Sequence, residues 1–191
     1  MYLKHLTAVL FLIALSPAYS QVVPAAKQER LPISVGAGFS NFYTDWSRYE
    51  AGPTVWIDWN FYRAPSLLRG FGLEVEGRDI NYLRTGDVPN LREDTAGGGV
   101  IYTWRHFRRF HYYGKFIMSY GSIDFSSLSP NYHHDTRTVK APGGGAEYRL
   151  WNSLWLRGDY EWQFWPDLGH GNTLTPNGFT IGAMFDLGHP L

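Results

Sequence analysis

Three segments of this chain carry residue types whose spacing could do chemistry. Tyr132-His133-His134-Asp135 places two imidazoles beside a carboxylate, and these are ligand types that bind divalent metal ions. Asp167-Leu168-Gly169-His170-Gly171-Asn172 places an acid three residues before a histidine, which are two of the three groups of a nucleophilic triad. The stretch Leu154–Trp165, LWLRGDYEWQFW, carries an arginine, an aspartate and a glutamate at every second position. Each segment can act only if the fold supplies the missing partners.

The two histidine segments are incomplete as they stand. Adjacent histidines cannot easily share one coordination geometry with Asp135, and no third ligand is obvious, so we interpret the first segment as a polar loop. The second resembles the corresponding segment of the outer-membrane lipid A deacylases, whose pattern is His, one residue and then Ser-Asn. Here His170 and Gly171 are followed directly by Asn172, so the serine nucleophile is missing. We therefore predict no catalytic residue, no metal and no cofactor, with a lipid A-modifying enzyme as the alternative.

The third segment has the pattern of a β-strand, in which successive side chains point to opposite faces. A helix would spread its charges around the circumference, so a period of two residues fits better. The charged series contains Arg157, Asp159 and Glu161. The other series is apolar and ends in aromatic residues: Leu154, Leu156, Gly158, Tyr160, Trp162 and Phe164.

The same alternation recurs along the chain and predicts eight strands. We place them at 32–40, 53–62, 70–82, 94–104, 111–123, 136–150, 154–165 and 177–187. Longer polar loops at 44–52, 83–93, 124–135 and 166–176 alternate with short turns at 63–69, 105–110 and 151–153. Pro142 and Gly143–Gly145 predict a bulge or sharp bend within the sixth strand. Strand length and loop asymmetry predict an all-β, eight-stranded antiparallel up-and-down barrel that spans a membrane.

The first twenty residues predict export. Leu6–Leu15 is an apolar run, Pro17 breaks it, and Ala18-Tyr19-Ser20 places small residues where a signal peptidase cuts. We therefore expect a cleaved signal peptide at 1–20, a flexible lead-in at 21–31 and a barrel at 32–191. The formal net charge of zero provides no basic footprint for nucleic acid. The chain has no cysteine, which excludes a disulfide framework.

The two faces of the predicted strands suggest which side meets lipid. Balanced charge at mid-strand suits a narrow lumen, where buried ions must be paired. The predicted lumen polar network is Asp58, Glu74, Glu76, Arg78, Lys115, Glu147, Arg149, Arg157, Asp159 and Glu161. The predicted aromatic girdle at the membrane interfaces is Phe39, Trp59, Phe61, Tyr102, Trp104, Tyr112, Tyr120, Trp162 and Phe164. A soluble lipocalin-like small-ligand carrier, with the apolar face inside, is the weaker alternative.

With these features, residues 32–191 resemble the OmpA-type outer-membrane β-barrel domain family of Gram-negative bacteria. The final strand, Gly178–Leu187, is similar to the terminal strand that the assembly machinery of that family recognises, although this chain ends on Leu191 and not on an aromatic residue. The resemblance implies an outer-membrane location and contact with outer-membrane lipid and lipopolysaccharide. We expect a monomer with a structural or surface-interaction role, long loops outside the cell and at most a very narrow pore.

Overall fold

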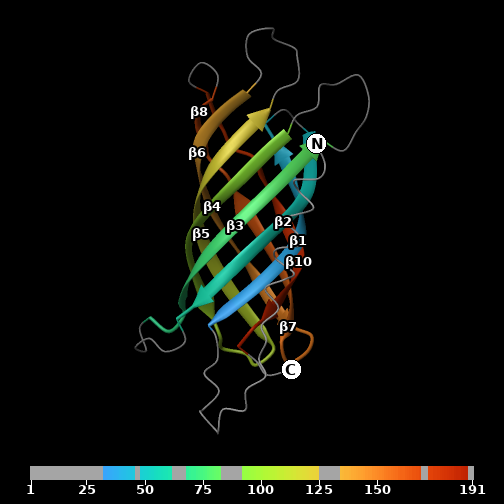
Figure 1. The fold of residues 1–191 in the computed structure, drawn as a ribbon, viewed down its shortest axis with the longest axis vertical. Helices are drawn as coiled ribbons and strands as arrows, with labels where there is room; N and C mark the ends of the chain where they lie inside the picture. The colour runs from blue at the N-terminus through green and yellow to red at the C-terminus, as the bar shows by residue number, and fades with distance from the viewer. Residues whose placement is uncertain are drawn as a thin grey trace, which may run out of the picture.

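The computed structural model describes residues 32–45, 48–61, 68–82, 92–124, 134–168 and 172–188 of the chain. The regular secondary structure of this part of the chain consists of β-strands, and strands that are neighbours in the sheet run in opposite directions (Figure 1). Their bounds are β1 (Ile33–Thr44), β2 (Arg48–Asn60), β3 (Phe71–Tyr82), β4 (Arg92–Trp104), β5 (Phe110–Asp124), β6 (His134–Arg149), β7 (Leu154–Trp162), β8 (Trp165–Leu168), β9 (Asn172–Leu174) and β10 (Asn177–Asp186).

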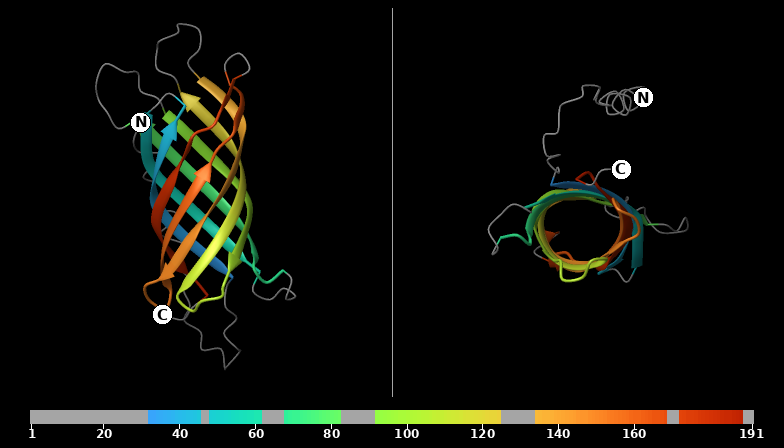
Figure 2. Two further views of the ribbon diagram at one scale, coloured as in Figure 1. Left: turned by 180° about the vertical axis from the view of Figure 1, so that it is seen from behind. Right: turned by 90° about the horizontal axis from the view of Figure 1, so that it is seen from below.

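Eight of these strands close into a barrel, in the order β1-β10-β7-β6-β5-β4-β3-β2. Closure joins the first strand to the last, from Ser34 opposite Asp186 to Tyr43 opposite Asn177. Figure 2 shows the closed ring viewed along its axis. The predicted eight-stranded antiparallel up-and-down barrel is confirmed. We call the end at which β1, β3 and β5 finish the upper end, and the end at which β1 begins and β10 finishes the lower end, as they stand in Figure 1.

The strands are staggered around the barrel. A path through directly paired residues leaves β6 at Thr138 and returns to β6 at Tyr148, ten residues further along. Such a stagger tilts the strands against the barrel axis, typically by about 35–45°. Side chains that meet at one height inside the barrel therefore come from positions that are not directly paired.

Alternation alone decides which side chains enter the interior. Tyr112 and Tyr113 are neighbours of identical chemistry on β5, yet Tyr112 is 52% exposed and Tyr113 is 3% exposed. The apolar series predicted from the sequence faces outwards on every barrel strand, and the polar series faces inwards. This arrangement excludes the lipocalin-like alternative, which requires an apolar interior.

All four predicted long loops are shorter in the structure than the sequence suggested, and the third loses Asp124 to β5 and two residues, His134 and Asp135, to β6. β2 begins at Arg48 and β4 at Arg92, so Glu50 and Glu93 are strand residues and not loop residues. Because both residues are charged, the sequence pattern suggested loops, but the inward–outward alternation continues through them. Glu50, for example, pairs with Phe42 and belongs to the same inward series as the rest of β2. Much of the predicted last loop forms the β8–β9 hairpin, a separate two-stranded sheet at the upper end.

The predicted bulge in the sixth strand is wrong. β6 pairs with β5 in unbroken register from His134 to Tyr148, with Pro142 directly opposite Phe116. Proline has no N–H to give to a ladder. The pairing is interrupted on the other side of β6, which faces β7. There the continuous pairing covers Gly143–Arg149, and beyond Pro142 towards the upper end there is one isolated bridge, between Lys140 and Phe164.

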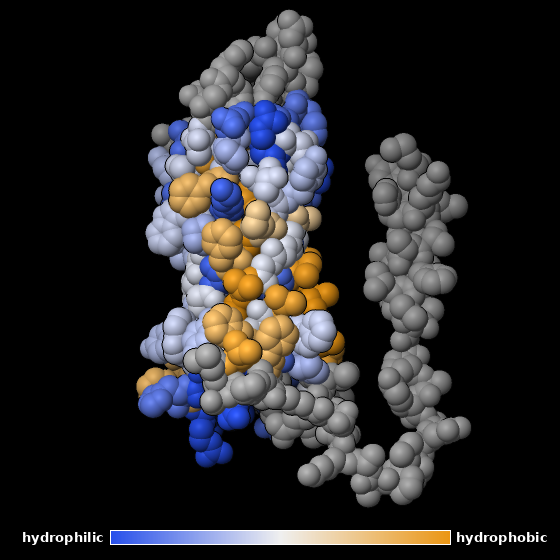
Figure 3. Space-filling view, turned by 90° about the vertical axis from the view of Figure 1, so that its left-hand side faces the viewer, coloured by the Kyte–Doolittle hydropathy of each residue, from blue (hydrophilic) through white to orange (hydrophobic). Residues whose placement is uncertain are grey.

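The outer surface of the barrel carries an apolar band. Figure 3 shows hydrophobic residues gathered at mid-height, with hydrophilic residues towards both ends. Val55, Ile57 and Val75 are each more than half exposed there. A barrel whose apolar side chains face outwards presents a surface of this kind to lipid. Among the described residues, no helix is both long and apolar enough to cross a membrane.

Candidate functional site: the barrel interior

The interior of the barrel gathers most of the buried charge in the described part of the chain. Most of it comes from four strands, β2, β3, β5 and β7. The residues that contact one another there are Asp58, Glu74, Glu76, Arg78, Lys115, Arg157, Asp159 and Glu161, which we call the central network. All eight are at most 7% exposed.

Arg157 is the hub of the lower half of this network. Its guanidinium lies 3.1 Å from Asp58 and 2.6 Å from Glu74, and its Nε donates a 2.7 Å hydrogen bond to the Tyr113 hydroxyl. The same guanidinium lies over two aromatic rings, 4.9 Å from the centre of Trp56 and 4.4 Å from that of Tyr113. Cation–π contact of this kind is worth more where water is excluded. The arginine is therefore held by ion pairs along its plane and by rings across its faces.

Arg78 and Lys115 connect the remaining carboxylates. Arg78 donates to Glu76 at 2.6 Å and to Glu161 at 2.7 Å. Lys115 lies 2.6 Å from Glu76, 3.1 Å from Glu161 and 3.4 Å from Glu74, so it links the Arg78 and Arg157 halves. Removing ions from water costs several kcal/mol each, and close, multiple pairing of this quality is what offsets that cost.

The central network is richer in carboxylates than in cations. It contains five carboxylates and three cationic side chains. The interior of an eight-stranded barrel is just wide enough for its own side chains. These eight side chains contact one another across the interior.

An apolar layer lies above the central network at the upper end. Trp165, at the start of β8, is fully buried against Ile123 and Val139, with Leu174 of β9 beside them. Gly121 makes room for the indole, because a Cβ at this position would collide with the ring. The indole N–H donates a hydrogen bond of 2.9 Å to the Gln163 side chain. The Gln163 amide in turn donates a hydrogen bond of 3.1 Å to Glu161. The hairpin is thereby joined to the ion pairs below it.

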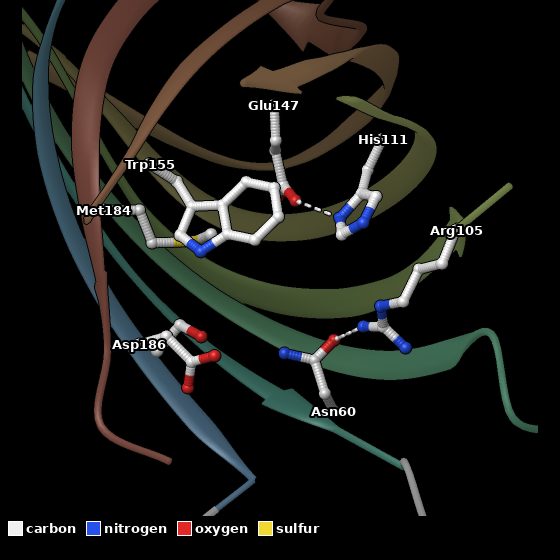
Figure 4. Close-up of a pocket in the computed structure, with 8 residues that line it drawn as sticks. Asn60, Arg105, His111, Glu147, Trp155, Met184 and Asp186 are labelled. Atoms are coloured by element: carbon white, nitrogen blue, oxygen red, sulfur yellow. Dashed lines mark hydrogen bonds and ion pairs between the residues drawn. The ribbon is translucent and has the colours of Figure 1, made fainter. Parts of the chain in front are cut away.

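A small cavity opens near the lower end (Figure 4). Its volume is about 30 Å³, which suits a water molecule and not a larger ligand. Arg105 donates a hydrogen bond of 2.8 Å to the Asn60 side chain. His111 lies 3.7 Å from Glu147 and packs on Trp155, with ring centres 4.5 Å apart. These contacts make a polar lower rim that is separate from the central network.

The structure places the ten predicted lumen residues in two groups. Eight form the central network. Glu147 faces the lower cavity, and Arg149, half-buried, lies over the ring of Trp155 at 5.7 Å. The predicted lumen polar network did not include Tyr113, Gln163 and Trp165. All three are interior residues that follow the inward parity of the neighbouring strand residues, so that signal could have found them.

The predicted girdle residues all lie on the outer face, at different heights. Trp59, Phe61, Tyr102, Trp104 and Tyr112 lie near the lower end, and the ring centres of Tyr102 and Trp104 are 4.6 Å apart. Tyr120, Trp162 and Phe164 lie towards the upper end, whereas Phe39 is midway along β1.

Neither histidine segment forms a site within the described part of the chain. His133 and His170 lie outside the described residues. His134 opens β6 and contacts Asp124 at 2.6 Å, and Asp135 contacts Arg137. The described residues contain no group of three or more side chains that could hold a metal ion.

Comparison with known proteins identifies the group to which this architecture belongs. Residues 6–186 match the outer membrane protein beta-barrel domain family. No curated protein sequence matches the chain significantly.

Solved structures of similar fold come from several bacteria. Neisserial surface protein A has a TM-score of 0.64 at 9% identity, over 81% of this chain and 95% of that one. Ail, the attachment invasion locus protein of Yersinia pestis, has a TM-score of 0.53 at 15% identity, over 80% and 95%. A major outer membrane protein of Thermus thermophilus has a TM-score of 0.53 at 12% identity, over 80% and 98%. At these identities the likeness concerns the fold.

Proposed function

The chain belongs to the outer membrane protein beta-barrel domain family, and we propose that it is a closed, non-catalytic barrel with a structural or surface-interaction role. In this proposal the apolar band anchors the protein in the outer membrane, with the aromatic residues near its two ends at the lipid interfaces. The upper end, with the β8–β9 hairpin, faces the outside, and the lower end faces the periplasm.

The observation that supports a closed barrel is the filled interior. The central network occupies the middle of the barrel, and the apolar layer around Trp165 lies above it. An ion that crossed would have to separate Arg157 from Asp58 and Glu74, and each buried charge left without its partner costs several kcal/mol. We therefore expect at most a very narrow pore.

The surface role follows from what the barrel exposes once the interior is closed. Two proteins of similar fold are named for a surface location and for attachment, and the upper connections are the part of this chain that would meet an external partner. Outer-membrane lipid and lipopolysaccharide would contact the outer face, and the assembly machinery would contact β10. We expect the barrel to act as a monomer.

Orientation is the first property to test, and the absence of cysteine from the chain makes the test clean. Single cysteines would be introduced at Thr173, exposed on the β8–β9 hairpin, and at Phe107, 54% exposed in the lower connection between β4 and β5. A membrane-impermeant maleimide added to intact cells should label Thr173→Cys and not Phe107→Cys. Labelling of Phe107→Cys alone would reverse the proposed orientation.

Closure is tested by electrical recording in planar lipid bilayers. The purified, folded protein should give no stable ohmic current, because the central network spans the lumen. Arg157→Ala, which removes the hub of the network, should give brief openings if it folds. A steady conductance in most insertions of the wild-type protein would refute the closed barrel and make a pore function the better proposal.

A further inference from the structure

Two buried carboxylates at the upper end take no part in the central network. Glu50 on β2 and Glu93 on β4 both face the interior and are 0% and 1% exposed. They stand on the two sides of β3, where Ile80 pairs directly with Glu93. The neighbouring register position on the outer face is occupied by two aspartates, Asp79 opposite Asp94, which both contact Arg92. Glu93 therefore lies at a height where the outer face is charged, above the apolar band.

Among the described residues, all four oxygens of these two carboxylates lack a hydrogen-bond partner. Glu74 and Glu76 below them, by contrast, each contact cations. Arg78 is the cation that acts on Glu93, but its guanidinium is already bonded to Glu76 and Glu161. A buried ionised carboxylate without donors is costly, and two of them close together repel each other.

The surroundings of the pair are apolar. Glu50 is directly opposite Phe42 on β1, and Glu93 is directly opposite Ile80 on β3 and Ile123 on β5. These three apolar side chains are at most 1% exposed. Side chains of this kind offer neither donors nor charge to the two carboxylates.

A third carboxylate stands at the rim above the pair. Asp45 follows β1, is exposed, and adds its negative charge to the field at Glu93. It accepts a 3.0 Å hydrogen bond from the Thr175 hydroxyl, which holds it beside β10. The central network below also contains more carboxylates than cations, so it adds to the negative charge near the pair.

We propose that Glu50 and Glu93 form a binding site for a hydrated divalent cation of the Mg²⁺ or Ca²⁺ class, which reaches the site from the upper end. A single proton shared by the pair would engage one oxygen of each carboxyl group and leave one negative charge, whereas a divalent ion balances both charges and its waters donate to the carboxylate oxygens. Mg²⁺ is typically held by one or two carboxylates together with several waters, and this chain supplies that number of ligands.

The test is calorimetric titration of the folded protein in non-ionic detergent, after metal removal and in the absence of lipopolysaccharide. Wild-type protein should bind one MgCl₂ or CaCl₂ equivalent with a dissociation constant on the order of 10⁻⁴–10⁻³ M, as weak extracellular sites do. Glu50→Gln and Glu93→Gln should each weaken binding at least tenfold. Asp94→Asn, which alters an exposed carboxylate bonded to Arg92, is the matched control and should bind as the wild type does.

A thermal melt provides the second readout. Magnesium should raise the melting temperature of the wild type and of Asp94→Asn but not that of either glutamine variant, because a ligand stabilises only a protein that binds it. Each glutamine variant removes a repulsive charge and should fold, as judged by its heat-dependent migration on a gel. Three results would overturn the proposal: no saturable binding in the wild type, unchanged binding in both glutamine variants, or stabilisation of the wild type by acid but not by magnesium.

Discussion

Replacing Arg157 by alanine tests whether the central network holds the barrel together. The arginine side chain is 1% exposed and contacts Asp58 at 3.1 Å, Glu74 at 2.6 Å and Tyr113 at 2.7 Å. Removing one partner from a buried ion network costs about 3–5 kcal/mol, because the carboxylates that stay behind are buried without a counter-charge. We expect a loss of unfolding free energy in this range.

Arg92 supplies a matched control that differs chiefly in burial. It also contacts two carboxylates, Asp79 at 3.0 Å and Asp94 at 3.1 Å, but its side chain is 47% exposed on the outer surface. Exposed ion pairs contribute about 0–1 kcal/mol, since water screens them and solvates the partner that is left. Arg92→Ala should therefore change the stability little.

The assay is urea unfolding of the protein in lipid vesicles, followed by tryptophan fluorescence. If the unfolding free energy falls by about 2–3 kcal/mol per molar urea, the loss predicted for Arg157→Ala lowers the midpoint by roughly 1–2.5 M. Arg157→Lys keeps the charge but loses the planar pair of donors, so its midpoint should lie between those of wild type and alanine. Equal midpoints for Arg157→Ala and Arg92→Ala would refute the reasoning that buried pairing stabilises the interior.

Three further substitutions test other parts of the barrel by the same unfolding measurement. Trp165→Ala should cost about 3–5 kcal/mol, because a fully buried indole leaves a cavity in the upper layer. Trp151, 70% exposed, is the control, and Trp151→Ala should cost far less; similar costs would mean that the Trp165 indole does not stabilise the upper layer. Gly145→Ala should cost about 1–3 kcal/mol, since its Cβ would collide with the backbone of β7, and Gly158→Ala, which has room, should be near neutral. Val75→Lys, 59% exposed and midway along β3, should cost about 2–4 kcal/mol in vesicles if this face meets lipid; tolerance of the lysine would contradict that placement.

Much of this fold could be predicted from local alternation. Period-two patterning is a property of each strand by itself, so it identified the strands, their inner and outer faces and the alternation of long and short connections. Tyr112 and Tyr113 illustrate this, because parity alone sends one outwards and the other inwards. The same parity extends to Glu50 and Glu93, but their polarity and the neighbouring turn residues led us to place both in loops.

What the tertiary structure decided is which inward side chains meet. Arg157 and Asp58 are 99 residues apart, and their contact depends on closure of β1 onto β10 and on a stagger of ten residues around the ring. Stagger is a collective property of all eight pairings, so no single strand encodes it. The sequence by itself determined the wall of the barrel and its charged inner face. The pairing of those charges, the packing of Trp165 against Ile123 and Val139, and the apolar surroundings of Glu50 and Glu93 arose only when the ring closed.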